Sequence, residues 1–311
     1  MKRQALSPLG ALKLCAFRVA ASGARVSPAA MRTLAPAAGD LAWVLNVAAR
    51  RRVRANLRGL LPNAGADALR RTERSIFRSI ARYYAELLAL PVTSPRTLER
   101  RAIVEGYEHL TAARAEGRGL ILASVHVGPG ELVMQGLAAR GVFYTAMIER
   151  LNPEPLGELV RALREAHGHR YVFAGVAGAK ELIRVVRAGG VVALLVDRDV
   201  LGTGTPVTFL GRTIRAPAGP IELAALTGAP LLPACAAWLP DGRYAVRILP
   251  PLHIERSARK GDALRREIER LLALFAPHFR AHADQWLVLQ RFWEDESRNT
   301  GAGYTGSPAP W

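Results

Sequence analysis

Leu120-Ile-Leu-Ala-Ser-Val-His126-Val-Gly-Pro-Gly-Glu131 is the stretch of sequence that first indicates the fold. Its first five residues are a short, mainly apolar run that predicts a buried strand. Pro129 suits the first position of a following helix, which would put Glu131 at the third position. His126 then lies just past the carboxyl end of the strand, where open α/β sheets place their ligands. The turn between strand and helix would let His126 and Glu131 converge.

Strand-like runs and helical patterns alternate along the rest of the chain. The predicted strands are Leu120–Ser124, Val142–Met147, Tyr171–Phe173, Val191–Val196, Leu231–Ala236 and Tyr244–Leu249. The helical patterns cover Glu131–Ala139, Pro155–His167, Ala177–Arg187, Gly219–Leu226 and Gly261–Phe275. This alternation predicts an α/β fold with a largely parallel central sheet.

The region before the first predicted strand is helical in pattern and rich in arginine. Apolar positions in residues 9–20 repeat at helical spacing, and Leu41–Ala49, which contains Trp43, leads into clustered arginines. Such a pattern fits burial among lipid tails combined with attraction to anionic headgroups. A surface helix packed on its own domain, with a solvated basic end, would give the same pattern. Another helix is expected over Ala66–Leu90, with a break at Pro91–Pro95.

These patterns divide the sequence into three predicted regions. We expect an N-terminal helical membrane-associating region over residues 1–95 and an α/β domain over residues 96–296. Residues 297–311 show no pattern and predict a disordered tail. The net charge of +17 and the pI near 11.0 indicate partners that carry negative charge. Nucleic acid is disfavoured as a partner because no zinc-finger spacing, basic-region heptad or aromatic-rich recognition module is present.

Export and membrane spanning are both disfavoured by the sequence. Lys13 and Arg18 interrupt what would be the apolar core of a signal peptide. The longest weakly charged stretch, Ala216–Pro240, contains several prolines and suits a buried helix and strand better than a membrane span. Cys15 and Cys235 are far apart and match no metal or disulfide framework, so a reducing compartment is expected.

His126 and Glu131 together suggest proton-transfer chemistry. A neutral imidazole can remove a proton from a hydroxyl near pH 7, and a carboxylate on its other nitrogen fixes the tautomer and stabilises the imidazolium. The G-x-S-x-G nucleophile motif is absent, which favours direct attack by an acceptor hydroxyl over an acyl-enzyme. Alternatively, Glu131 only caps a helix and His126 is a core residue whose hydrogen bonds are satisfied.

Two other groups of charges are candidates for binding. Asp197-Arg198-Asp199 follows a predicted strand, and an Asp-x-Asp pattern in isolation suggests a metal-dependent glycosyltransferase that holds a nucleotide sugar. Arg212 and Arg215 precede the helix predicted from Gly219, where arginines suit a phosphate site. A solvated surface pair is the alternative for these two arginines.

The wider sequence resembles the bacterial lipid A (lauroyl and myristoyl) acyltransferases and their relatives, the phosphatidylinositol mannoside acyltransferases. Ser124–Glu131 is similar to the H-x-x-x-x-D/E motif of glycerolipid acyltransferases. The similarity continues in order over most of the chain, through Arg52–Pro62, Ile148–Pro153, Arg164 with Gly168, Val196–Asp199, Gly202–Gly204, Val207–Gly211, Ala216–Gly219, Ala229–Pro233, Asp284–Trp286 and Arg291–Trp293.

This resemblance implies a glycerolipid-acyltransferase-like layered fold and a specific reaction. A fatty acyl chain would pass from an acyl thioester, acyl-CoA or acyl carrier protein, to a hydroxyl of a membrane glycolipid or phospholipid. His126 would be the general base and Glu131 would orient it, with no metal or other cofactor. The residues implied to line the substrate site are Glu149, Arg150, Arg164, Asp197, Arg198, Asp199, Arg212, Arg215 and Gly219. The implied location is the cytoplasmic face of the bacterial inner membrane.

The sequence departs from the lipid A members at two places. Val127–Gly130 stands where they commonly carry an aromatic pair, and Asp197-Arg-Asp199 where they commonly carry Asp-Gln-Asp. Both departures favour the mannoside branch. A protein that only coats anionic membranes is a third class, which predicts salt-sensitive liposome binding and no product.

Overall fold

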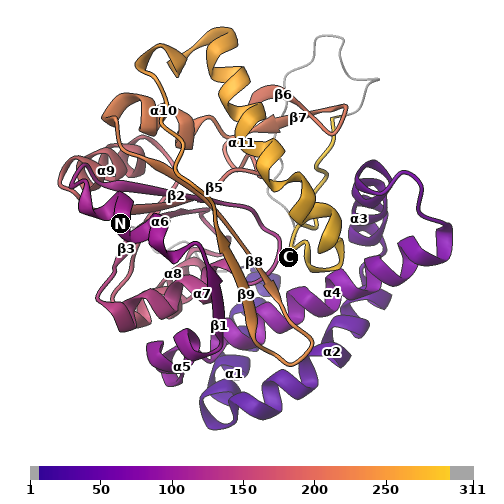
Figure 1. Ribbon diagram of the computed structural model, residues 1–311. Coiled ribbons are helices and arrows are strands. Elements are labelled where there is room, and N and C mark those ends of the chain that lie inside the picture. Colours follow the sequence, from indigo (N-terminus) through magenta and orange to yellow (C-terminus); the bar gives the residue numbers. More distant parts are fainter. Residues whose placement is uncertain (1–6, 295–311) are drawn as a thin grey trace.

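A seven-stranded sheet forms the centre of the computed structural model, which describes residues 7–294 (Figure 1). The strand order is β1-β9-β8-β2-β5-β3-β4. All neighbouring pairs are parallel except β8–β9. The strands are β1 (Ala102–Glu105), β2 (Leu120–Ser124), β3 (Tyr144–Ile148), β4 (Arg170–Phe173), β5 (Val191–Leu195), β8 (Leu231–Trp238) and β9 (Tyr244–Ile248). The predicted α/β class with a largely parallel sheet is confirmed, whereas the tail predicted over 297–311 lies outside the described residues.

Helices cover both faces of this sheet (Figure 1). On one side lie α9 (Val176–Arg187), α10 (Gly219–Thr227) and α11 (Gly261–Ala281); on the other lie α6 (Tyr107–Ala115), α7 (Gly130–Gln135) and α8 (Glu154–Arg164). Alternate residues of β2 enter the two cores, with Ile121 and Ala123 in one and Leu120 and Leu122 in the other. A strand buried on both faces reads as a continuous apolar run, which is why the sequence indicated β2 clearly.

Four helices precede the sheet, α1 (Pro8–Val26), α2 (Pro28–Leu45), α3 (Val47–Leu60) and α4 (Ala66–Leu88), and the short α5 (Pro95–Arg100) follows them. Helix α2 crosses α4 closely, because a Cβ on Gly39 would lie 2.6 Å from Arg78 Cα. Beside this crossing, Asp40 accepts paired 2.7 Å hydrogen bonds from Arg74 and from Arg78. These bonds hold the pKa of Asp40 well below its usual range. None of the described helices is long and apolar enough to cross a membrane.

Buried polar residues fasten these helices to one another and to the C-terminal segment. The fully buried Glu73 accepts hydrogen bonds from Trp43 Nε1 at 2.7 Å and Arg54 Nε at 2.8 Å. Asn56 donates to Gln290 O at 2.7 Å and accepts from Phe292 N at 2.9 Å. The largest core cluster contains residues from both sides of the predicted boundary at residue 95, including Leu57, Phe77, Ile121 and Phe275. The boundary itself stays a prediction.

A separate two-stranded hairpin, β6 (Thr205–Phe209) and β7 (Arg212–Ala216), packs beside α11. Its two-residue turn, Leu210-Gly211, has φ angles of 51° and 77°. Positive φ at both turn positions is the type I′ geometry, which matches the twist of the flanking strands. The sequence did not indicate this hairpin, because Leu is an unusual residue at the first turn position.

Candidate active site

Several of the candidate residues follow the carboxyl ends of three adjacent strands. His126 follows β2, Asp197 follows β5 and Glu149 follows β3 directly. Ser124 is paired in register with Leu195, so His126 and Asp197 each lie two residues beyond a matched pair. Parallel strands put their carboxyl ends at one edge, and this is where α/β sheets bind ligands.

Asp197 is the carboxylate that contacts the His126 imidazole. Its Oδ1 lies 2.8 Å from Nδ1, and both carboxylate oxygens accept from the His126 backbone N–H at 3.1 Å. The Asp197 side chain is fully buried, while 22% of the His126 side chain is exposed. In a neutral ring the Nδ1–H donates to Asp197, so that Nε2 carries the lone pair. This tautomer suits a base that accepts its proton at Nε2.

The backbone around His126 is held by the segment that contains Asp284-Gln-Trp286. Leu287 N donates to His126 O at 2.7 Å and Gly128 N donates to Gln285 O at 2.9 Å. Gly128 has φ 75°, and a Cβ there would lie 1.9 Å from Ala236 O. Only glycine fits at this position, so the turn after His126 has a defined path.

Glu131 has partners other than the imidazole. Its Oε1 lies 2.7 Å from Arg164 Nε, close but not aligned as a hydrogen bond, and its Oε2 accepts from Tyr83 OH. Arg164 Nη2 also donates to Tyr83 OH at 3.1 Å. Within residues 7–294, no hydrogen bond joins His126 to Glu131. The structure therefore differs from the predicted pair: Asp197 occupies the place beside His126 that was expected for Glu131. Helix α7 also begins one residue later than expected, with Pro129 as its N-cap.

Burial shapes the electrostatics of this second cluster. Burial and the nearby Glu131 raise the pKa of Tyr83 well above its ordinary value, so the phenol stays protonated and donates. Burial disfavours the charge of Arg164, yet attraction to Glu131 holds its pKa well above the ordinary value. Arg164 is thus a fixed cation with one fifth of its side chain exposed (19%).

The buried side-chain amide of Gln135 contacts the backbone carbonyl of Arg164. Gln135 is fully buried, and its Nε2 lies 3.0 Å from Arg164 O and 3.1 Å from the hydroxyls of Tyr144 and Tyr171, so three acceptors share its two N–H groups. Its Oε1 lies 3.0 Å from His167 Nδ1. Sequence reasoning missed both Gln135 and Tyr83. Gln135 is a polar residue on the otherwise apolar side of α7, which is a signal that could have found it.

The remaining predicted residues near this edge have protein partners. Arg198 Nη2 donates to Glu149 Oε2 at 2.7 Å, with both side chains partly exposed. The Arg150 guanidinium lies 4.5 Å from the centroid of the Phe173 ring. Asp199 accepts from the backbone N–H of Thr203 at 3.2 Å and of Gly204 at 2.7 Å, so it fastens its own loop.

The two arginines of the predicted phosphate site lie on β7 of the hairpin, and each contacts another part of the protein. Arg215 donates to Glu294 Oε1 at 2.8 Å and to Gly204 O at 3.0 Å. The Arg212 guanidinium lies 5.5 Å from the Trp293 ring centroid. Gly219 begins α10, and a Cβ there would meet no atom within 4 Å. In residues 7–294, no group of three or more His, Cys, Asp or Glu side chains is placed to hold a metal ion.

Sequence comparison identifies the chain as an acyltransferase. The model of the bacterial lipid A biosynthesis acyltransferase family matches residues 16–295, so the chain belongs to this family. It is 34% identical over 222 residues to a phosphatidylinositol mannoside acyltransferase of Mycobacterium tuberculosis, covering 69% of this chain and 68% of the relative. It is 30% identical over 246 residues to the protein of that name from Mycolicibacterium smegmatis, covering 78% of each. The resemblance inferred from the motifs is confirmed, and the acyltransferase class replaces the glycosyltransferase alternative.

Proposed function

We propose that this enzyme transfers a fatty acyl chain from an acyl thioester to a hydroxyl of a membrane glycolipid or phospholipid, with a phosphatidylinositol mannoside-like or lipid A-like acceptor. The observation that carries the proposal is the contact between Asp197 and Nδ1 of the partly exposed His126. The names of the relatives support the glycolipid acceptor. Acyl-CoA or acyl carrier protein supplies the thioester, and the reaction needs no further cofactor.

In the proposed mechanism His126 is the general base. Its Nε2 takes the proton of the acceptor hydroxyl as the oxygen attacks the thioester carbonyl. Asp197 stabilises the imidazolium that forms. The tetrahedral intermediate then collapses, the carbon–sulfur bond breaks, and the imidazolium returns its proton to the leaving thiolate. The base is neutral again after one cycle.

We assign Glu131 a positioning role through Arg164. Glu131 and Tyr83 hold the Arg164 guanidinium in one orientation. A fixed cation is suited to stabilise the negative charge that develops on the thioester oxygen, because it does not reorganise during the reaction. The ion pair between Glu149 and Arg198 is proposed to line the site on its β3 side.

The N-terminal helices supply a surface suited to a lipid bilayer. The large apolar side chains of α1, α2 and the start of α3 that are about half or more exposed are Leu12, Val19, Val26, Leu34, Leu41, Val44, Leu45 and Val47. Exposed arginines on the same helices include Arg18, Arg25 and Arg32. Apolar side chains can enter the acyl region while arginines pair with anionic headgroups. We propose that this face docks on the cytoplasmic leaflet and brings the lipid acceptor to the enzyme.

The test is acyl transfer by the purified chain with acyl-CoA or acyl carrier protein thioesters and candidate acceptors, phosphatidylinositol mannosides or lipid A precursors. His126→Ala should abolish turnover while leaving the circular dichroism spectrum unchanged. His253→Ala, at an exposed position away from the sheet edge, is the matched control. Full turnover by His126→Ala would refute the mechanism.

A further inference from the structure

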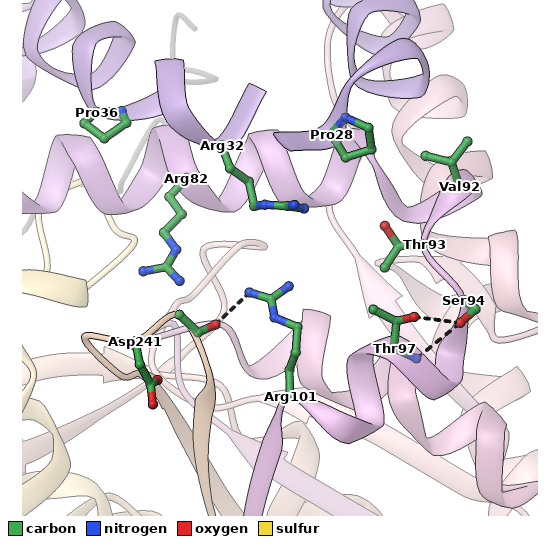
Figure 2. A pocket seen from close by; sticks show the side chains of 11 residues that line it. Pro28, Arg32, Pro36, Arg82, Val92, Thr93, Ser94, Thr97, Arg101 and Asp241 are labelled. Carbon is green, nitrogen blue, oxygen red and sulfur yellow. Dashed lines mark hydrogen bonds between the residues drawn. The ribbon is translucent and has the colours of Figure 1, made fainter. Parts of the chain in front are cut away.

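A cavity of about 610 Å³ lies between the N-terminal helices and the turn that joins β8 to β9. Its walls come from α2, from α4, from the segment that enters α5, and from the β8–β9 turn (Figure 2). None of the residues assigned to the catalytic chemistry lines it. A volume of this size is ordinary for a site that holds a small organic molecule.

Three arginines from three different parts of the chain converge on this cavity. Figure 2 shows the side chains of Arg32, Arg82 and Arg101 reaching into the same space. Arg101 Nη2 donates to Gly242 O at 2.8 Å, and Arg82 Nε donates to Glu86 at 3.1 Å. These contacts fix two guanidinium groups before any ligand arrives. Arg32 is exposed on α2 and completes the set.

Positive charge exceeds negative charge in the cavity wall. Asp241 also lines the cavity, but its carboxylate accepts from Arg243 N at 3.0 Å and Arg243 Nε at 2.7 Å. Glu86 is buried behind the wall, where it faces Arg82, Arg101 and the Tyr244 hydroxyl. The hydroxyls of Thr93, Ser94 and Thr97 add polar groups to the opposite side.

We propose that this cavity binds the phosphate group of a phosphate ester, at a site distinct from the site of acyl transfer. Converging guanidinium groups match the planar, multi-oxygen geometry of phosphate, and prior fixing of two of them lowers the entropy lost on binding. Thr93 already donates its hydroxyl proton to Ala89 O, but Ser94 and Thr97 share one hydrogen bond, so one of these two hydroxyls keeps a proton that it can donate to a phosphate oxygen. The ester group occupies the rest of the volume, which is larger than a phosphate ion needs.

Helix α4 links this cavity to the candidate active site, and helix α2 links it to the surface that we propose docks on the membrane. Arg82 and Tyr83 are neighbours on α4, and Arg82 lines the cavity while Tyr83 bonds to Glu131 at the candidate active site. Arg32 lies on α2, whose outer surface exposes Leu34 and Leu41. The phosphate can therefore belong to a lipid headgroup at the membrane surface or to a soluble ester such as a nucleotide.

The experiment is isothermal titration calorimetry of the full chain with three probes: inorganic phosphate, dihexanoyl phosphatidylglycerol and coenzyme A. Arg32→Gln should raise the dissociation constant of the phosphate-bearing probes by about tenfold, as expected for loss of one charge-assisted contact. Arg32→Lys, which keeps the charge, should lose less. Arg96→Gln removes an exposed arginine of α5 outside the cavity and is the matched control.

The pattern across the probes identifies the source of the phosphate. Weakening confined to the phospholipid assigns the site to a headgroup, and weakening confined to coenzyme A assigns it to a soluble ester. Equal weakening of all probes means that the phosphate alone is recognised. Absence of binding by the unmodified chain, or identical binding by Arg32→Gln and Arg96→Gln, would overturn the proposal. Because binding is measured directly, this result is independent of acyl transfer.

Discussion

Asp197 Oδ1 lies 2.8 Å from Nδ1 of His126, although the two residues are 71 positions apart in the chain. The sheet itself creates this contact. Strands β2 and β5 are paired in register up to Ser124 and Leu195. His126 lies two residues after Ser124, and Asp197 lies two residues after Leu195. The same aspartate also accepts hydrogen bonds from the His126 backbone N–H, so it fixes both the ring and the backbone of this residue.

The first prediction concerns this contact. Asp197→Asn should lower kcat by about 10³- to 10⁴-fold, because an amide at this place stabilises the wrong tautomer and cannot stabilise the imidazolium. The KM of the acceptor should change little, since Asp197 acts through His126. Steady-state kinetics of acyl transfer separate the two constants. Asp67→Asn, on the exposed first turn of α4, is the control, and kcat should be unchanged there. Equal losses in both variants would contradict the assigned role.

The second prediction concerns the hydroxyl between Glu131 and Arg164. Tyr83→Phe removes two hydrogen bonds to charged groups and should lower kcat/KM by about 10- to 100-fold. Tyr84→Phe is the matched control, because its ring packs edge-on against that of Tyr83, with centroids 5.4 Å apart. Thermal unfolding followed by circular dichroism should show that both variants are folded at the assay temperature. If Tyr83→Phe retains full kcat/KM, the hydroxyl does not position Arg164.

The third prediction is a dependence of stability on pH. Burial lowers the pKa of His169 to about 4 from an ordinary value of 6.5, because the buried ring disfavours its charge. Between these values the unfolded chain binds a proton that the folded chain does not, so stability is full above pH 6.5 and is lost as pH falls toward 4. The loss is about 3 kcal/mol for one such histidine. His278, whose pKa burial also lowers to about 4, acts in the same direction.

Urea unfolding at pH 7.5 and pH 4.5 measures this dependence. His169→Gln should reduce the difference in unfolding free energy between the two pH values. His253→Gln, at an exposed position, should leave the difference unchanged. An identical pH dependence in all three proteins would show that folding does not lower the pKa of His169.

The fourth prediction concerns the exposed apolar face of α2. Replacement of Leu41 and Leu45, which are 59% and 71% exposed, by serine should weaken binding to anionic vesicles by about tenfold or more. Raising the salt concentration should weaken binding further, because the arginines contribute by attraction. Leu274→Ser, on α11 and 40% exposed, is the control for loss of a surface leucine. Co-sedimentation with vesicles gives the partition coefficients, and no change in the double variant would remove α2 from the docking surface.

Much of the fold followed from patterns of neighbouring residues. The buried strands β2 and β5 are continuous apolar runs, so their existence and approximate bounds were predictable. Strand β1 was not predicted, because it has four residues and alternates between half-buried and exposed positions at the sheet edge. Helix α6 was also missed, and its nine residues give only a weak apolar stripe.

The site was predictable in part for the same reason. His126 and the Asp197–Asp199 segment both follow apolar strands, and their position at the sheet edge could be inferred from each strand alone. Their pairing could not, because strand order is a non-local property that no periodicity encodes. Tyr83 belongs to a helix whose sequence gave no indication that it faced the catalytic strands.

By itself, the sequence determined the α/β class, the place of His126 after a buried strand, and membership of the acyltransferase family through motifs in a fixed order. These properties depend on local hydrophobic periodicity and on residue identity. Only the tertiary structure decided that Asp197 contacts the imidazole while Glu131 pairs with Arg164 and Tyr83. The physical reason is that the order of β2 and β5 and the packing of α4 against α7 arise from burial of apolar surface between distant segments, which sets the distances between charges that are remote in the chain.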